Sequence, residues 1–140
     1  MTDIFVRPAV DGDRSDVSRL EESARAEEAH HRGSWLEAPG AVPAGQTVTV
    51  VGGLGDTILG VARAREGEDG RWVVALVHVE SGGRGVGVGD ALIVSLLDEV
   101  RRRGGRHLAA SAQPGDRSLK NLYERHGMVA RTILVGRDLT

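Results

Sequence analysis

The sequence predicts a single domain of the α/β (α+β) class. Three observations predict this class: a meander of strand-like segments over 47–80, amphipathic helices over 11–28 and 88–103, and further strands between and after the later helices. A length of 140 residues suits one domain and suffices to bury a hydrophobic core. We therefore expect residues 1–140 to fold as one unit around one sheet.

The N-terminal third predicts one strand and one helix. Residues 3–9 alternate apolar and polar side chains, which is typical of a short strand. Residues 11–28 carry apolar residues amid dense charge, as an amphipathic helix does, and Asp11 or Asp13 is placed to cap its start. Residues 30–46 contain glycines and prolines at close intervals, so they predict a loop or a broken second helix.

Three strands in a meander follow. The β-branched segment 47–53 and the segment 57–66 are separated by a turn at Gly55-Asp56, which predicts a hairpin. A second turn leads into 71–80, a long apolar run that is typical of a buried central strand.

The C-terminal half alternates helix and strand. The helix 88–103 has its apolar residues on one stripe and basic residues in its last turn, before two glycines. A strand is predicted over 106–112, a helix over 116–125 that Asp116 caps, and a last strand over 128–139.

Composition and charge limit the classes of function. The 18 basic residues against 20 acidic ones give a net charge of −2, which argues against nucleic acid as a partner because duplex binding depends on phosphate neutralisation. No apolar run approaches the ~20 residues of a membrane span, and the N-terminus lacks the form of a signal peptide. We therefore expect a cytoplasmic protein without a membrane partner.

Residue types that commonly bind metals are also sparse in the sequence. The sequence contains no cysteine, which excludes disulfides, thiolate metal sites and a cysteine nucleophile. His30 and His31 are adjacent and do not face one site on a helix. We therefore expect no metal.

A glycine-rich turn, GGRGVGVG at 82–89, separates the predicted central strand from the helix 88–103. Glycine in a regular element costs roughly 0.5–1 kcal/mol relative to alanine, so the cluster indicates a need for bare backbone. The N–H groups at a helix N-terminus are unpaired and carry partial positive charge, which makes a site for phosphate. The Arg84 guanidinium is expected to add a charge-assisted bond. The glycine spacing fits neither the P-loop pattern G-x-x-x-x-G-K-[ST] nor the dinucleotide pattern G-x-G-x-x-G.

The pattern that does fit is R-x-x-G-x-G, from Arg84 to Gly89. This turn resembles the acetyl-CoA signature of the GNAT superfamily of N-acetyltransferases, and the order of elements from about Val48 to Leu139 resembles that family too. The resemblance implies a mixed, mostly antiparallel central sheet of six or so strands flanked by helices, with a β-α loop that binds the acetyl-CoA pyrophosphate. The implied cofactor-binding residues are Val77, Val79, Arg84, Gly85, Val86, Gly87, Val88, Gly89 and Asp90.

A second segment, DRSLKNLYERHGM at 116–128, resembles the N-x-x-A-x-x-L-Y-x-x-x-G-F pattern of the same family. In many members the tyrosine protonates the departing CoA thiolate, so the resemblance implies Tyr123 as general acid. A phenol with a pKa near 10 suits a thiolate of similar basicity. The alternative is that Tyr123 only packs its helix against the sheet.

Acetyl transfer to an amine also needs an oxyanion donor and a base. The resemblance implies a backbone N–H near Val79 as the donor, on a strand edge that pairs with the pantetheine amides. Many members carry a glutamate earlier on this strand, but 72–77 reads Trp-Val-Val-Ala-Leu-Val here. His78 and Glu80, on one face of the strand, are the remaining candidates for the base. The alternatives are that His78 is a core histidine whose hydrogen bonds are satisfied, that Glu80 is a carboxylate at the edge of the loop, and that the acceptor needs no base.

The resemblance implies an acetyl-CoA-dependent N-acetyltransferase that acts directly on a small-molecule or protein amine, since no cysteine can carry the acetyl group. The alternative is a non-catalytic acyl-CoA-binding sensor. Trp35 lies where relatives place their acceptor-binding loop, so it either lines the cleft or pins the loop, and Trp72 is expected in the core or a subunit interface. The short C-terminal end predicts an exposed sheet edge, and hence a homodimer.

Overall fold

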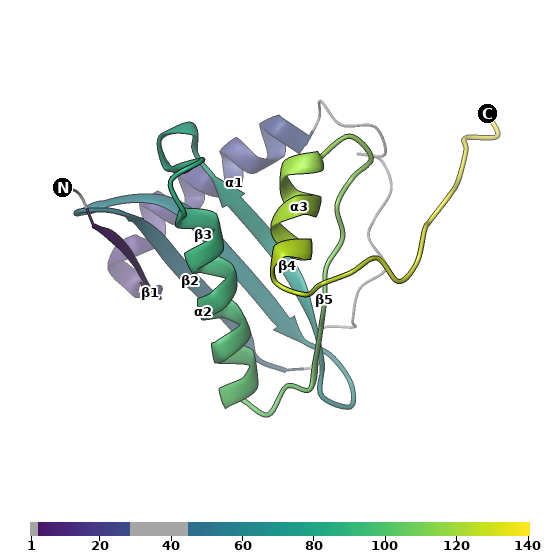
Figure 1. Cartoon of the computed structure of the whole chain (residues 1–140), viewed down its shortest axis with the longest axis horizontal. Coiled ribbons are helices and arrows are strands. Elements are labelled where there is room, and N and C mark those ends of the chain that lie inside the picture. The colour runs from purple at the N-terminus through teal and green to yellow at the C-terminus, as the bar shows by residue number, and fades with distance from the viewer. Residues whose placement is uncertain (1–2, 29–44) are drawn as a thin grey trace.

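The computed structural model describes residues 3–28 and 45–140, and Figure 1 shows one sheet with helices packed on it. The sheet has five strands, which follow the order of the sequence. The strands are β1 (Ile4–Pro8), β2 (Thr47–Leu54), β3 (Thr57–Glu66), β4 (Arg71–Val79) and β5 (His107–Ala109), and the helices are α1 (Arg14–Glu28), α2 (Val88–Arg102) and α3 (Arg117–Arg125). Short 3-10 turns precede α1 at Asp11–Asp13 and follow β4 at Ser81–Gly83.

The sheet is mixed and mostly antiparallel, as expected. Strands β1 to β4 form an antiparallel meander, and β4 pairs in parallel with β5. A bulge interrupts the pairing of β3 with β4 and leaves Ala75 without a register partner, which bends β4 at its middle. The pairing of β4 with β5 ends where Val73 lies opposite Ala109. The second half of β4 therefore pairs on one side only.

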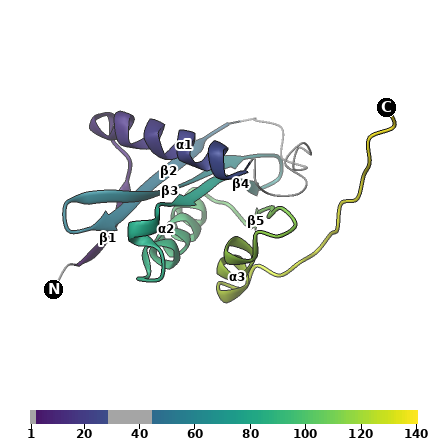
Figure 2. The ribbon, with the colours of Figure 1, turned by 90° about the horizontal axis from the view of Figure 1, so that it is seen from above.

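Helix α1 covers one face of the sheet, and α2 and α3 cover the other (Figure 2). Neighbouring residues of a strand point to opposite faces, so Val51 packs under α1 with Leu20, while Val50 packs under α2 with Leu92. All four side chains are fully buried. Each such side chain stabilises the fold by ~1.5–3 kcal/mol relative to an exposed one, so both faces of the sheet contribute to the core.

The apolar stripe predicted for α2 is confirmed. The side chains of this stripe, Val88, Leu92, Leu96 and Val100, are buried. Helix α2 also lies unusually close to the sheet, because a Cβ on Gly60 of β3 would lie 2.8 Å from the Leu92 Cδ1 atom. Trp72, expected in the core or an interface, lies in the core with no exposed surface.

The start of α1 differs from the expectation. Residues 11–13 form a 3-10 turn, and the Asp13 carboxylate accepts hydrogen bonds from the Val10 N–H (2.9 Å) and from the Arg7 guanidinium (2.6 and 2.9 Å). These bonds, that of Arg7 first, lower the pKa of Asp13 to about 2. Asp13 therefore ties the beginning of α1 to β1.

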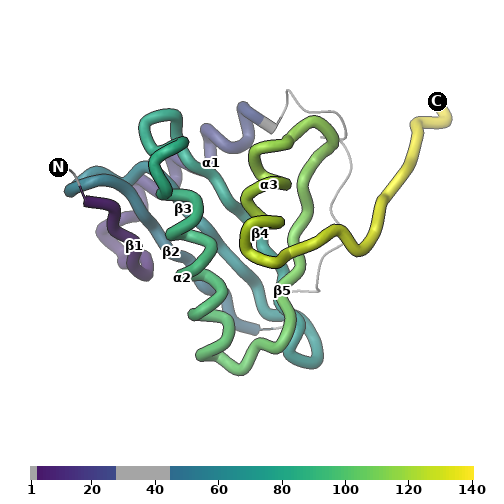
Figure 3. The backbone as a smooth tube through the Cα atoms, in the orientation of Figure 1, coloured from purple at the N-terminus to yellow at the C-terminus, as the bar shows by residue number. Residues whose placement is uncertain are grey.

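The strand predicted over 128–139 is wrong, and the one predicted over 106–112 shortens to β5. Residues 129–140 form no helix or strand, and Figure 3 shows them leaving the body of the molecule in an extended path. A strand pattern becomes a strand only where a neighbouring backbone supplies hydrogen bonds along its length, and this segment has no such neighbour among the described residues. The sheet accordingly has five strands instead of six.

Candidate active site

The open edge of β4 is the first part of the site. From Val74 onward this strand has no pairing with β5. The Glu80 N–H donates to the Leu59 carbonyl across the β3 side (2.8 Å). Because backbone groups alternate in direction along a strand, those of Val79 and Val77 point to the open side. The open strand edge that the resemblance implied is thus present on β4 beyond Val73.

The glycine-rich turn is the second part. Gly85 and Gly87 have φ angles of 74° and 99°, a left-handed conformation that favours glycine. The first hydrogen bond of α2 runs from the Ala91 N–H to the Gly87 carbonyl (3.0 Å). The backbone N–H groups of residues 85–90 have no acceptor among the described residues. The turn therefore presents a row of unpaired donors at a helix N-terminus, where an anion is stabilised.

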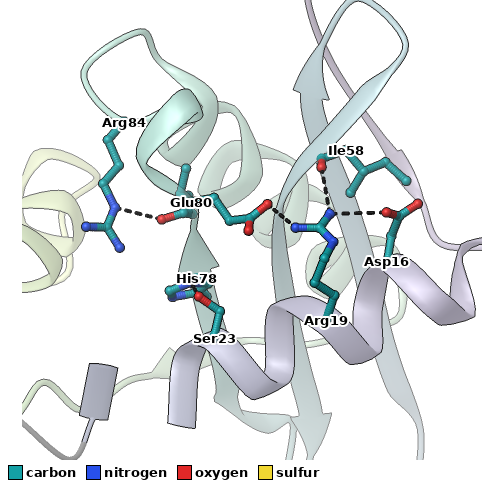
Figure 4. A network of polar contacts seen from close by, with 8 residues as sticks. Asp16, Arg19, Ser23, Ile58, His78, Glu80 and Arg84 are labelled. Atoms are coloured by element: carbon teal, nitrogen blue, oxygen red, sulfur yellow. Dashed lines mark hydrogen bonds and ion pairs between the residues drawn. The ribbon is translucent and has the colours of Figure 1, made fainter. Parts of the chain in front are cut away.

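Arg84 has a different environment from the one expected. Its Nε atom donates to the Val79 carbonyl at 2.7 Å, and its Nη2 atom lies 2.6 Å from the Glu27 carboxylate of α1. Its backbone N–H donates to the Ser81 carbonyl. Figure 4 shows the side chain folded back toward the end of β4. Arg84 therefore joins the turn to β4 and α1, and its guanidinium is engaged by these groups.

Asp90, in the first turn of α2, links this helix to α3. Its carboxylate accepts hydrogen bonds from His126 (2.8 Å) and from Arg125 (3.2 and 3.3 Å). The bond from Arg125 is the main cause of a lowered pKa of Asp90, and His126 adds to it. The Arg125 guanidinium compensates a negative charge that would otherwise oppose an anion at the turn.

Tyr123 lies on the same side of the sheet as the turn. It is 7% exposed and packs with Ile93 and Leu122 against Val77 of β4. Asp116 caps its helix by accepting from the Leu119 N–H (3.2 Å), as predicted. Burial raises the pKa of Tyr123, and the nearby carboxylate raises it further. The phenol is therefore protonated at physiological pH, and its hydroxyl has no hydrogen-bond partner among the described residues.

His78 and Glu80 lie on the opposite face of β4, beneath α1. His78 is 7% exposed, and its Nε2 atom lies 2.9 Å from the Ser23 hydroxyl. Burial lowers the pKa of His78, and this outweighs the opposing effect of the Glu27 carboxylate 3.8 Å from Nδ1. The Glu80 carboxylate pairs with Arg19, whose guanidinium also contacts Asp16 (Figure 4). The imidazole is thus neutral near pH 7, whereas the Glu80 carboxylate is held by a cation.

The structure brings the predicted residues into two groups around one strand. Val77 and Val79 border the open edge, Tyr123 lies on the α2 and α3 side, and His78 with Glu80 lies on the α1 side. The sequence indicated that His78 and Glu80 share a face, but it did not indicate their separation from Tyr123.

Three residues of α1 contact the predicted site residues and were not themselves predicted. Arg19, Ser23 and Glu27 recur at intervals of four, which places them on one side of a helix. Each contacts the region of β4 or the turn: Glu80, His78 and Arg84 respectively. The spacing was a usable signal, but the acidic residues around it made the segment resemble a solvated helix face.

Three residues that the sequence analysis considered lie outside the described part of the chain. They are Trp35, His30 and His31. The described residues contain no group of three His, Cys, Asp or Glu placed to hold a metal ion. None of the helices within 3–28 and 45–140 is long and apolar enough to cross a membrane.

The open edge of β4 and the turn at the start of α2 form the candidate site, and comparison with known proteins identifies the class of protein. The sequence model of the Acetyltransferase (GNAT) family matches residues 14–128, and the chain belongs to this family. No curated protein sequence matches the chain.

Solved structures support the fold. The aminoglycoside N-acetyltransferase AAC(6')-Iy in complex with the bisubstrate analog CoA-S-monomethyl-acetylneamine has a TM-score of 0.73 at 14% identity, with 99% of each chain covered. An acetyltransferase of Trypanosoma brucei has a TM-score of 0.65 at 23% identity, with 98% of this chain and 100% of that chain covered. A transcriptional regulator from Bacillus halodurans has a TM-score of 0.67 at 15% identity, with the same shares covered.

Membership of the family identifies the class of reaction. The chain is an N-acetyltransferase, and acetyl-CoA is its cosubstrate. The similar enzyme AAC(6')-Iy has also been solved in complex with CoA.

Proposed function

We propose that the chain transfers an acetyl group directly from acetyl-CoA to the primary amine of a small molecule. The absence of cysteine supports direct transfer, because no thiol of the protein can hold the acetyl group between two steps. The likeness of the fold to an aminoglycoside N-acetyltransferase supports a small-molecule acceptor over a protein amine.

In this proposal the glycine-rich turn binds the pyrophosphate of CoA. The unpaired N–H groups of Gly85, Val86, Gly87, Val88, Gly89 and Asp90 donate to the phosphate oxygens. Their number, in a turn that leads directly into the N-terminus of α2, is the observation that carries the proposal. Arg84 contributes by fixing the turn against the end of β4, since its side chain and its N–H already have partners.

The open edge of β4 then binds the pantetheine arm. An extended chain with amide groups pairs with a free strand edge as another strand would, and the groups of Val77 and Val79 face that edge. The Val79 N–H is directed toward the same space, so we assign it as the donor that stabilises the oxyanion of the tetrahedral intermediate.

The acid and the base lie on the two sides of this strand. The amine nitrogen attacks the thioester carbonyl carbon, the carbon–sulfur bond breaks, and the thiolate takes the proton of the Tyr123 hydroxyl. We assign His78 as the base that takes the proton of the amine, because its imidazole is neutral whereas Glu80 is paired with Arg19. In this arrangement the amine attacks from the α1 side of β4, where His78 lies, and the thiolate departs on the α2 and α3 side, where Tyr123 lies. After the transfer Tyr123 has lost one proton and His78 has gained one, and exchange of protons with solvent restores both residues.

The test is acetyl transfer followed by release of the CoA thiol. A thiol-detecting reagent reads only the product CoA, since the chain has no cysteine. We expect turnover with small primary amines, aminoglycosides among them, and none with a peptide that carries a free N-terminus or a lysine. Turnover with the peptide alone contradicts the assignment of the acceptor, and absence of turnover with every amine contradicts the proposal.

A further inference from the structure

Both nitrogen atoms of the His78 imidazole face side chains of α1. The Nε2 atom lies 2.9 Å from the Ser23 hydroxyl, and the Nδ1 atom lies 3.8 Å from the Glu27 carboxylate. Figure 4 shows the Ser23 hydroxyl against the ring, between α1 and β4. His78 is only 7% exposed, whereas Ser23 is half-buried. The Nε2 atom is therefore covered by a hydroxyl that is more accessible than the ring itself.

The surroundings of the ring determine which of its nitrogens accepts a proton. A carboxylate has no proton to donate, so the Nδ1 atom opposite Glu27 carries the ring proton of the neutral imidazole. The Nε2 atom is then the acceptor, and the Ser23 hydroxyl donates to it. A hydroxyl that donates its hydrogen keeps lone pairs that accept a second hydrogen bond. Ser23 is thus able to accept from an N–H group of a substrate while it donates to His78.

The other charged groups around the ring have partners of their own. They are Glu27 of α1, Glu80 of β4 and Arg84 of the turn. The Glu27 carboxylate pairs with Arg84, and the Glu80 carboxylate pairs with Arg19. Both carboxylates are therefore already engaged by a cation. Among the described residues, Ser23 is the side chain in hydrogen-bond contact with the imidazole.

We infer, building on the proposed function, that Ser23 relays the proton of the amine to His78. As the amine nitrogen forms its bond to the thioester carbonyl carbon, an amine proton passes to the Ser23 oxygen, and the Ser23 proton passes to the Nε2 atom of His78. The carbon–sulfur bond breaks, and the thiolate takes the Tyr123 proton. Ser23 ends with one proton, as it began, and His78 ends with one more. The relay allows a buried imidazole to act on an amine that it does not contact.

The first test removes the hydroxyl. We expect Ser23→Ala to lower kcat/KM for the amine by about 10²-fold, as His78→Gln does, and the double variant to lose no more than either single one, because two residues that pass one proton act as a unit. Ser23→Thr keeps a hydroxyl and is expected to recover most of the loss. Ser18→Ala, at an exposed serine of the same helix, is the matched control and is expected to change kcat/KM by less than twofold.

The outcomes distinguish the relay from the function on which it rests. A natural chain without turnover contradicts the proposed function, and the relay with it. A natural chain that turns over, with an unreduced kcat/KM in Ser23→Ala or with losses that multiply in the double variant, overturns the relay alone.

The second test is the solvent isotope effect, which a merely structural role of Ser23 does not alter. Two protons move together in the relay, so kcat/KM of the natural chain is expected to fall along a curve as the deuterium fraction of the water increases. In Ser23→Ala one proton moves, and a linear dependence is expected. The measurement on the natural chain needs no variant that must first fold. A linear dependence in the natural chain, or the same curve in both chains, overturns the inference.

Discussion

The Arg84 guanidinium lies 2.6 Å from the Glu27 carboxylate and 2.7 Å from the Val79 carbonyl, so one side chain joins the glycine-rich turn, helix α1 and the open edge of β4. The bond to Val79 fixes the strand where the thioester is expected to lie. The pair with Glu27 is half exposed and contributes little to stability by itself. We therefore expect the main effect of Arg84 to be to hold the backbone of the candidate site in place.

This arrangement predicts a selective loss of catalytic efficiency for Arg84→Met. Loss of a charge-assisted hydrogen bond to the Val79 carbonyl is expected to lower kcat/KM for acetyl-CoA by about tenfold, or ~1.4 kcal/mol. Glu27→Gln, which keeps that bond, is expected to lower it by less than twofold. Steady-state kinetics of both variants test this, with Arg101→Met at the exposed end of α2 as control. Equal losses in the Arg84 and Glu27 variants contradict the role assigned to Val79.

Tyr123→Phe tests the general acid. The substitution removes one hydroxyl that has no partner among the described residues, so the fold is expected to be unaffected. We expect kcat to fall by about 10²-fold or more, with the acetyl-CoA dissociation constant unchanged within about twofold. Rapid-quench kinetics and calorimetry measure the two quantities separately. A variant with full kcat shows that Tyr123 only packs α3 against the sheet.

The pH dependence tests His78. Because burial lowers its pKa from the ordinary value of 6.5, kcat/KM is expected to rise with pH through a value below 6.5 and then to level off. Tyr123 adds no alkaline limb up to pH 10, since its pKa is raised. His78→Gln is expected to lower kcat/KM by about 10²-fold and to abolish the acidic limb. The exposed His107→Gln is the control, and an acidic limb that survives in His78→Gln contradicts the assignment.

The same histidine predicts a change in stability with pH. The unfolded chain binds a proton at His78 near pH 6.5, whereas the folded chain resists it, so the free energy of unfolding falls as the pH decreases below 6.5. Above that pH the residue contributes no pH dependence. Urea unfolding at pH 7.5 and 5.5 is expected to show a smaller difference for His78→Gln than for the natural chain. An equal difference in both contradicts burial of a neutral imidazole.

Asp13→Asn tests the link between β1 and α1. The pKa of Asp13 is lowered to about 2, so its stabilising effect is present above its unfolded value near 3.8 and is lost as the pH falls toward 2. We expect the substitution to lower the free energy of unfolding by ~1–3 kcal/mol at pH 7. The difference from the natural chain should shrink near pH 2. Asp11→Asn is the control, and a loss that does not depend on pH contradicts the ion pair.

Close packing of α2 on the sheet predicts that Gly60→Ala is destabilising. The added Cβ lies 2.8 Å from Leu92 Cδ1, so the helix or the side chain must move, at a cost of ~1–3 kcal/mol. Gly82→Ala is the matched control, since its added Cβ meets the nearest side-chain atom at 3.7 Å. Thermal unfolding of the two variants compares them directly. Equal melting temperatures contradict the close approach.

Local patterns in the sequence were sufficient to predict most of the fold. The stripe of Val88, Leu92, Leu96 and Val100 repeats with helical spacing, and it faces the sheet as predicted. The close approach of α2 to Gly60 was not predictable, because it depends on how two distant elements pack. The strand over 128–139 was wrong for a related reason: its pattern indicates what the segment can do, but a strand forms only beside a neighbour.

The composition of the candidate site could be predicted from the sequence where its residues share one motif, but not where distant segments meet. The turn from Gly85 to Gly89 and the tyrosine of α3 each lie within a short recognisable pattern. The pairs of His78 with Ser23 and of Arg84 with Glu27 join residues more than fifty positions apart, and neither residue of a pair indicates the other. The guanidinium of Arg84 accordingly has partners that its place in the motif did not suggest.

The most direct test of the central claim is calorimetric titration of acetyl-CoA into the natural chain and into Gly87→Glu. The natural chain is expected to bind one acetyl-CoA, and to bind neither ATP nor NAD at comparable concentration. Gly87→Glu places a carboxylate at the row of N–H donors and is expected to abolish binding. Gly104→Glu is the control, because it also replaces a glycine with positive φ, at the other end of α2. Loss of binding only in Gly87→Glu supports the account, whereas equal binding in all three chains contradicts it.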